Sequence, residues 1–219
     1  MYKISELLDL SHTIAAPLFE GKDYPWEVLG GIREFILTLG PALSPEEFDS
    51  PEEGVWIAKD AKVFPSAYIG APCIIDHGAE VRHCAFIRGS AIVGKNCVVG
   101  NSVELKNAVL FDSVQVPHYN YVGDSVLGYK SHMGAGSITS NVKSDKTLVV
   151  VKNGTELIET GLKKFGAILG DHVEVGCNSV LNPGTVVGRG SSIYPVSCVR
   201  GAIPAGSIVK TGGVVVQRS

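Results

Sequence analysis

Apolar residues recur at every sixth position through the middle of this chain. Ten such positions follow one another without a gap, and a small or short residue stands four places after each of the first nine. A helix, with about 3.6 residues per turn, and a plain strand, with a period of about two, do not produce this spacing. A parallel β-helix does, because each six-residue unit forms one short strand and one turn, and three units close a coil. The ten positions are Ile57, Val63, Ile69, Ile75, Val81, Ile87, Val93, Val99, Leu105 and Phe111.

The sixfold pattern is interrupted twice before it resumes and runs almost to the end of the chain. After Phe111 the next position in register is Tyr121, which predicts four extra residues in the coil that contains His118. The second interruption spans residues 141–165. There, two apolar runs flank Asn153-Gly154 and predict an inserted β-hairpin with a tight turn. Loops that leave a solenoid scaffold often carry function, although a surface bulge explains the spacing equally well.

Residues 1–50 lack the sixfold pattern and have apolar residues at spacings of three and four. This spacing predicts two short amphipathic helices, the second with Pro25 in its first turn and its end at Gly40. We expect these helices to cap the open first coil, whose strand edges would otherwise be unpaired. The sequence therefore predicts an all-β chain with an N-terminal helical cap at 1–50 and a β-helix at 51–219, which carries the inserted hairpin at 141–165.

Net charge, apolar runs and cysteine spacing limit the classes of binding partner and the cellular compartment that the sequence favours. The 219 residues carry a formal net charge of −3 and no long basic run, which argues against nucleic acid. No apolar run approaches the roughly 18 residues that span a membrane, and the first residues lack the apolar stretch of a signal peptide. The 5 cysteines are odd in number and lack C-x-x-C spacing, which favours reduced thiols in the cytoplasm over disulfides or a metal site.

Two cations and one histidine are the candidates for chemistry. Arg88 and Lys106 stand one 18-residue coil apart and directly follow the inward residues Ile87 and Leu105, so they occupy the same outward position on neighbouring coils. Stacked cations repel each other unless an anion lies against them, so they are either a phosphate clamp or two solvated surface charges. His118 follows in the interrupted coil, where an imidazole could act as a general base or simply face solvent.

Three runs, GNSVELKNAVL, PHYNYVGDSVLG and MGAGSITSN, resemble the acetyltransferase domain of the bifunctional N-acetylglucosamine-1-phosphate uridyltransferase/glucosamine-1-phosphate acetyltransferase. That domain belongs to the hexapeptide-repeat acyltransferases. The resemblance covers roughly residues 55–210 and has no gap from 88 to 141. It implies left-handed coils and a homotrimer with its site between neighbouring chains. The implied activity is acetyl-CoA-dependent N-acetylation of an amino-sugar phosphate, without a metal. The Gly-rich L-x-G-G-x-G-T-R segment of the uridyltransferase half is not found, so that activity is not expected.

The resemblance also assigns roles to residues at the acceptor end of the site. Arg88 and Lys106 match positions that hold the sugar phosphate, and Tyr121 matches a further contact with it. His118 matches the general base. His132 stands where the family often has Asn, which leaves the identity of the sugar open.

The coenzyme end of the site follows from the same resemblance. Ala135 and Asn141 match positions that contact the thioester and the pantetheine arm of acetyl-CoA. A backbone N–H near Asn141 would support the developing oxyanion, which gives this residue a catalytic role as well. Past the hairpin, Cys177 and Pro195 fall where the family has other small residues that contact the coenzyme.

Three other functions stay open at this point. A β-helix with the same pattern could be a non-catalytic binding or assembly module, or an acetyltransferase for a different amine. Histidines of a β-helix can also bind zinc, as in γ-class carbonic anhydrases, which needs three converging imidazoles. His77 and His83 are six residues apart and so face different sides of a coil, and His118 and His132 lack the H-x4-H pair of that family. The spacing therefore disfavours zinc.

Overall fold

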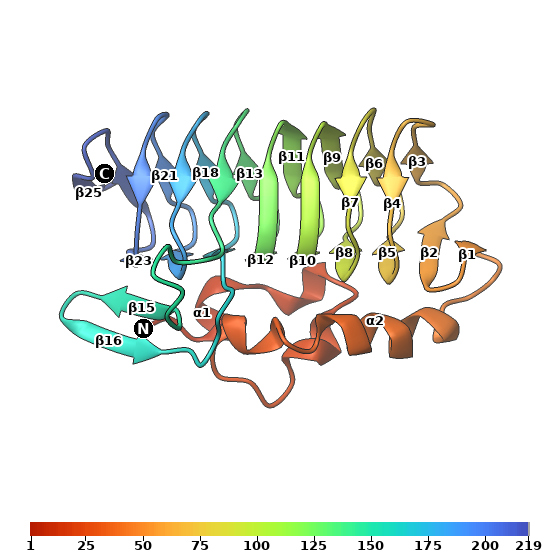
Figure 1. The fold of residues 1–219 in the computed structure, drawn as a ribbon, viewed down its shortest axis with the longest axis horizontal. Coiled ribbons are helices and arrows are strands. Elements are labelled where there is room, and N and C mark those ends of the chain that lie inside the picture. The colour runs from red at the N-terminus through yellow and green to blue at the C-terminus, as the bar shows by residue number, and fades with distance from the viewer. Residues whose placement is uncertain (219) are drawn as a thin grey trace.

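The computed structural model describes residues 1–218, and most of them form a parallel β-helix of stacked three-sided coils (Figure 1). Each coil adds one short strand to each of three faces, which we number in the order in which the chain reaches them. Strands of one face pair in parallel with their equivalents in the neighbouring coils. The fold class predicted from the sequence, a left-handed parallel β-helix, is confirmed.

Two long strands join faces, and the other strands of the β-helix each belong to one face. Strands β10 (Glu104–Leu110) and β12 (Tyr121–Leu127) begin on the third face and end on the first. The first face also has β2 (Val55–Ala58), β5 (Cys73–Ile75), β8 (Ala91–Val93), β17 (Ala167–Leu169), β20 (Thr185–Val187) and β23 (Ala202–Ile203). The second face has β3 (Lys62–Val63), β6 (Glu80–Val81), β9 (Val98–Asn101), β11 (Gln115–His118), β13 (His132–Met133), β18 (Glu174–Val175), β21 (Ser192–Ile193) and β24 (Ser207–Val209). The third face also has β4 (Tyr68–Ile69), β7 (Phe86–Ile87), β14 (Ile138–Thr139), β19 (Val180–Leu181) and β22 (Cys198–Val199).

The inward column predicted from the period of six forms the interior of these coils. Burying one aliphatic side chain of this kind stabilises the fold by roughly 1.5–3 kcal/mol relative to leaving it exposed. Because equivalent residues pair from coil to coil, their side chains stack on one another along the axis. Six successive members of the column are completely buried: Ile75, Val81, Ile87, Val93, Val99 and Leu105.

The coil after Val93 is one residue shorter than the period of six predicts. Its first-face strand places Leu110 beside Val93, where the sequence analysis placed Phe111. Phe111 is nevertheless completely buried, because its ring packs edge-on against Phe19 of the N-terminal segment, with 5.7 Å between the ring centroids. Phe111 therefore matches the sixfold spacing by position only, because it is buried against the N-terminal segment and not inside the coil.

The next coil is also one residue short. Leu105 pairs with Val122, so Tyr121 is not an inward position and the predicted insertion of four residues is wrong. Both shortenings fall at the corner between the third and first faces, where Asn107 and Asp124 turn the chain with φ of 50° and 49°. Asn and Asp tolerate this left-handed conformation better than most other residues with a side chain. Strands β10 and β12 therefore continue through this corner without a break.

The N-terminal segment lies lengthwise along the first face and not over the open first coil, where we expected it (Figure 1). The cause is a second apolar column, because the middle residue of most first-face strands points outward and is aliphatic. These six side chains are completely buried: Ile74, Ile92, Val109, Val126, Ile168 and Val186. The segment contributes apolar side chains to the same core cluster, among them Leu7, Leu8, Phe19, Trp26, Leu29, Ile32 and Ile36.

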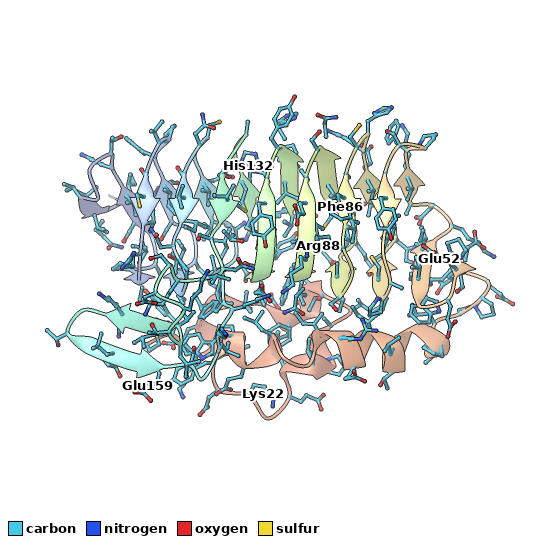
Figure 2. The ribbon with its side chains drawn as sticks, viewed as in Figure 1. Lys22, Glu52, Phe86, Arg88, His132 and Glu159 are labelled. Carbon is cyan, nitrogen blue, oxygen red and sulfur yellow. The ribbon has the colours of Figure 1, made fainter. Side chains whose placement is uncertain are left out.

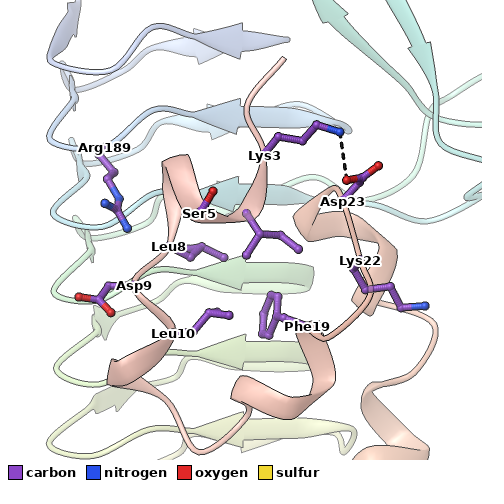
Figure 3. A pocket seen from close by; sticks show the side chains of 10 residues that line it. Lys3, Ser5, Leu8, Asp9, Leu10, Phe19, Lys22, Asp23 and Arg189 are labelled. Carbon is purple, nitrogen blue, oxygen red and sulfur yellow. Dashed lines mark ion pairs between the residues drawn. The ribbon is translucent and has the colours of Figure 1, made fainter.

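The segment is less helical than its pattern predicts. Helix α2 (Ile32–Leu39) ends before Gly40 as expected, but Pro25 begins a separate 3₁₀ turn, η3 (Pro25–Val28). Figure 3 shows Leu8, Leu10 and Phe19 around a cavity of about 690 Å³ beneath the first residues, beside the ion pair of Lys3 and Asp23 at 3.2 Å. The remaining helical elements are α1 (Ile4–Leu7), η1 (Leu10–His12), η2 (Ala16–Phe19) and η4 (Gly40–Ala42).

One antiparallel strand pairs with a single face at each end of the β-helix. Strand β1 (Phe48–Glu52), which spans the predicted boundary at residue 50, pairs with β2 at the first coil. Strand β25 (Val215–Gln217) pairs with β24 at the last coil. The first-face edge of the first coil is therefore paired with backbone, whereas β3 and β4 pair, among the described strands, only with the coil that follows them.

The inserted hairpin consists of β15 (Val150–Asn153) and β16 (Glu156–Glu159). Asn153 pairs with Glu156, so the two turn residues are Gly154 and Thr155, one position later than predicted. Gly154 has a φ of 60°, which a glycine adopts at no steric cost. The hairpin lies beside the N-terminus, where the amino group of Met1 is 4.0 Å from Glu156 (Figure 1).

Three aspartates at the corner between the first and second faces predict an unusual dependence of stability on pH. Burial raises the pKa of Asp76, Asp112 and Asp171 above the usual range. The folded chain then binds more protons than the unfolded chain between the unfolded and folded pKa values, so stability rises as the pH falls through that range. We expect the free energy of unfolding in urea to be larger at about pH 5 than at about pH 7.5.

Below the unfolded pKa of about 3.9 the trend should reverse. Hydrogen bonds from Ser11 and Thr147 lower the pKa of Asp9 and Asp145, and protonating these carboxylates costs stability. The variant Asp76→Asn should show a smaller gain between neutral and mildly acidic pH than the wild type. A free energy of unfolding that falls steadily from about pH 7.5 to pH 5 would contradict the role of the raised pKa values.

Candidate active site

The two cations singled out in the sequence lie side by side on the third face. Figure 2 labels Arg88 on this face. Leu105 pairs with Ile87, which places Arg88 and Lys106 in the same outward position of neighbouring coils, as predicted. Their repulsion is relieved within the chain. Arg88 donates from Nη1 to Oε1 of Glu104 at 2.8 Å, and this bond raises the pKa of the arginine.

Lys106 belongs to a more buried network that centres on Asp124. The Lys106 ammonium donates to both carboxylate oxygens of Asp124, at 2.8 and 3.0 Å. Asn107 and Asn141 donate to the same carboxylate from their side-chain amides, at 3.0 and 2.5 Å. Only 3% of Asp124 is exposed, so these donors replace the water that a carboxylate needs. The sequence analysis missed Asp124 and Asn107. It treated Tyr121 as an inward residue, and in that register Asp124 does not lie beside Asn107 or Lys106.

Tyr121 lies across the surface of this network. Asn141 donates to its hydroxyl oxygen at 3.1 Å, and burial followed by the charge of Asp124 raises the pKa of the phenol. The ring folds over Gly123, where an added Cβ would lie 2.5 Å from the hydroxyl oxygen. A glycine at position 123 therefore lets the tyrosine lie flat beside Lys106. The structure thus brings together Arg88, Lys106, Tyr121 and Asn141, four of the residues predicted for the site.

A second group of predicted residues forms a column at the corner between the second and third faces. The N–H of Gly136 donates to the carbonyl of His118 at 2.9 Å, which places Ala135 one coil beyond His118. The N–H groups of Asn178 and Val196 donate in the same way to Ala135 and Cys177. His118, Ala135, Cys177 and Pro195 therefore occupy equivalent positions of four successive coils.

Asn120 anchors the turn that follows His118, the last residue of β11, and the sequence analysis missed it. Its Oδ1 accepts the N–H of His118 at 3.2 Å, and its amide donates to the carbonyl of Gly134 at 2.8 Å and to Ser137 at 3.1 Å. Only 2% of Asn120 is exposed. A buried side chain with all of these bonds ties the exposed histidine to the coil that carries Ala135. The run P-H-Y-N, with a residue that favours turns at its end, was the signal available in the sequence.

The two groups lie at opposite edges of the third face of one chain. The strand from Tyr121 to Asp124 separates the corners by about 10 Å, at a rise of roughly 3.3 Å per residue. His132 joins neither group. It points outward on the second face, where its Nδ1 lies 2.8 Å from Oε2 of Glu174.

The described part of the chain offers two further findings. Among residues 1–218, no three side chains of His, Cys, Asp or Glu lie together in a group that could hold a metal ion. No helix within the same range is long and apolar enough to cross a membrane.

The comparison with protein families adds a match over most of the β-helix. A family model described as the GMPPB C-terminal domain matches residues 69–189, which is more than half of the chain. The match begins at the end of β4, the last strand of the first coil, and includes both groups of site residues except Pro195. It also spans the inserted hairpin.

Curated relatives are longer than this chain. The bifunctional sugar-1-phosphate nucleotidylyltransferase/acetyltransferase of Sulfurisphaera tokodaii is 33% identical over 156 residues, which are 71% of this chain and 39% of that protein. The bifunctional protein GlmU of Methanococcus vannielii is 33% identical over 178 residues, which are 80% of this chain and 42% of that protein. The chain thus spans about two fifths of the length of these relatives. These matches confirm the resemblance found in the sequence.

One solved structure illustrates how far the similarity extends in three dimensions. The acetyltransferase domain of PglB from Neisseria gonorrhoeae, in complex with acetyl coenzyme A, is 18% identical to this chain and has a TM-score of 0.34. The alignment covers 87% of this chain and 76% of that chain. A TM-score this low does not support a functional assignment.

Proposed function

The chain belongs to the GMPPB C-terminal domain family, and from this premise we propose that it is an acetyl-CoA-dependent N-acetyltransferase for an amino-sugar phosphate. The observation that carries the proposal is the cluster of Arg88, Lys106 and Tyr121 on one face, held in place by the buried Asp124. Two adjacent cations beside a phenol suit the phosphate and hydroxyl groups of such an acceptor. The relative from Sulfurisphaera tokodaii, whose name includes an acetyltransferase, supports the same activity.

The proposed reaction is acyl transfer from the thioester to an amine. The phosphate of the acceptor binds Arg88 and Lys106 and competes with Glu104 and Asp124 for them. His118 takes one proton from the ammonium, and the nitrogen lone pair attacks the thioester carbonyl carbon. The C–S bond then breaks as the nitrogen gives up a second proton, so the products are an amide and coenzyme A, whose sulfur takes up a proton in its place. Holding both substrates in place supplies much of the rate.

The placement of the two groups favours a site between chains. The phosphate-binding cluster and the His118 column lie at opposite edges of the third face of one chain, about 10 Å apart. If copies associate as a homotrimer, the His118 corner of one chain can face the Arg88 cluster of its neighbour. His132, on the second face, would then also approach the acceptor from a neighbouring chain.

An acceptor screen tests the proposed function. The chain is incubated with acetyl-CoA and one amine at a time, and release of coenzyme A thiol is followed by colour formation. We expect turnover with glucosamine-1-phosphate or another phosphorylated amino sugar, and much less with glucosamine itself. Turnover with the unphosphorylated sugar at the same efficiency would contradict the phosphate clamp, and no turnover with any amine would favour the non-catalytic binding module.

Replacing Arg88 or Lys106 should weaken binding of the phosphorylated acceptor and leave binding of acetyl-CoA nearly unchanged. We expect Arg88→Ala and Lys106→Ala each to raise KM for the phosphorylated acceptor by roughly tenfold to a hundredfold, because each removes a charge-assisted hydrogen bond. KM for acetyl-CoA should stay within about twofold. The matched control is Arg33→Ala, which removes an exposed arginine of helix α2, on the first-face side of the coils. Equal effects on both substrates would refute the assignment of the clamp.

A further inference from the structure

A second cavity lies on the far side of the coils from the third face. It has a volume of about 400 Å³, which is within the range of small-molecule sites. Its floor is the corner between the first and second faces, and its walls are the loop at 11–14 and the connector at 42–48. The N-terminal segment thus encloses a space above three successive coils, independently of the proposed acetyl transfer.

One oxygen of a buried carboxylate in this cavity lacks a hydrogen-bond partner among the described residues. Asp76 lines the cavity and is completely buried. Its Oδ1 accepts the N–H of His77 at 2.7 Å, whereas its Oδ2 has no hydrogen-bond partner among residues 1–218. A buried carboxylate oxygen without a donor is unfavourable, so the native fold is expected to supply one. The chain supplies none, which points to a ligand that does.

The other charged side chains that line the cavity are mostly carboxylates, so the missing hydrogen-bond donor is expected to carry a positive charge. Asp112 lines the same space, and its Oδ1 accepts the N–H of Lys95 at 2.9 Å. Glu47 adds a third carboxylate, against Lys95 as the only lysine or arginine among the lining residues of the described chain. His77 also lines the cavity, but its Nδ1 is 2.9 Å from Oδ1 of Asp60, a residue that does not line the cavity. Burial raises the pKa of Asp76 and Asp112, and the nearby charge of Lys95 offsets this effect only in part.

We propose that this cavity binds a small aliphatic amine in its protonated form, with its ammonium group donating to Oδ2 of Asp76 and its other end near Asp112. An ammonium group offers three donors and a positive charge, which is what the unpaired oxygen and the excess of carboxylates require. Ile14, Leu43 and Phe48 line the cavity and suit the methylene groups between the polar ends of such a ligand.

The test uses 1,3-diaminopropane as the probe and 1,3-propanediol as its uncharged counterpart of similar size. Binding to the full chain is measured by titration calorimetry in an amine-free phosphate buffer at constant ionic strength. We expect the diamine to bind and the diol not to bind. Asp76→Asn should weaken binding of the diamine by roughly tenfold to a hundredfold, because it removes a charge-assisted contact. Glu20→Gln, which removes an exposed carboxylate elsewhere, should not change it.

Three results would overturn the proposal. Equal binding of the diol and the diamine would show that the cavity holds water or any polar molecule. Unchanged diamine binding in Asp76→Asn would place the amine elsewhere. Binding of Mg²⁺ or Ca²⁺ that excludes the diamine and depends on Asp76 would make the cavity a metal site. Circular dichroism checks the fold of each variant, and Asp112→Asn, with the same expected loss of affinity, replaces Asp76→Asn if that variant does not fold.

Discussion

Replacing His118 by alanine should lower kcat about 10²–10⁴-fold and leave KM for both substrates nearly unchanged. The side chain is exposed at the corner of the coil, one position before Ala135 in the column that we assign to acetyl-CoA. It makes no hydrogen bond within residues 1–218 through its ring, so its loss should leave the fold intact. A general base acts in the transition state and contributes little to binding the substrates, which is why the effect should fall on kcat.

The control for this variant is His132→Ala. Both residues are histidines near the surface, but His132 bonds to Glu174 on the second face and is assigned to the acceptor, not to proton transfer. It should change KM for the acceptor more than kcat. His118→Gln should not restore activity, because an amide cannot take the proton. The variant should also lose the dependence of kcat on pH that a general base gives the wild type. A variant that keeps more than about half of the wild-type kcat would show that the base is another residue.

The period of six revealed the interior of the β-helix because nothing but stacked coils produces it. Each inward residue contacts its equivalents in the neighbouring coils. The spacing in the sequence therefore shows which residues are neighbours in the folded chain. The same relation explains why the adjacent placement of Arg88 and Lys106 was predicted correctly. Once the coil length is known, residues 18 positions apart must lie side by side.

The period failed where burial had a second source. Phe111 and the middle residues of the first-face strands are buried from outside, by a segment that is far away in the sequence. The sequence did contain a signal, because first-face strands such as residues 73–75 and 91–93 are apolar throughout, whereas a strand exposed on one side alternates. Reading that double column would have placed the N-terminal segment along the first face.

The polar cluster could be predicted only in part, because its centre depends on the exact coil length. One missing residue at each of two corners turns Asn107 and Asp124 into stacked neighbours with left-handed backbones. With the four extra residues that the sequence predicted before Tyr121, Asp124 had no defined partner in the neighbouring coil. No residue pattern states where a single residue is missing, so Asp124 emerged from the structure.

Replacing Asp124 by alanine should lower the free energy of unfolding by roughly 3–5 kcal/mol, the usual cost of removing one partner of a buried ion pair. Its carboxylate accepts from Lys106, Asn107 and Asn141, and all three donors would be left without it in a half-buried site. For a chain of this length the midpoint of thermal unfolding should fall by roughly 6–20 °C.

The matched comparison is Glu104→Ala, which breaks the neighbouring pair with Arg88 on the same face. The side chains of Glu104 and Arg88 are 33% and 47% exposed, against 5% for Asp124, so water can replace the lost contact and the midpoint should hardly move. Activity should separate the two variants in a second way. Glu104→Ala frees Arg88 for the phosphate and should keep or lower KM for the acceptor, whereas Asp124→Ala releases Lys106 and Asn141 from fixed positions and should raise it. If both variants unfolded at the same temperature, Asp124 would not be the centre that holds the cluster together.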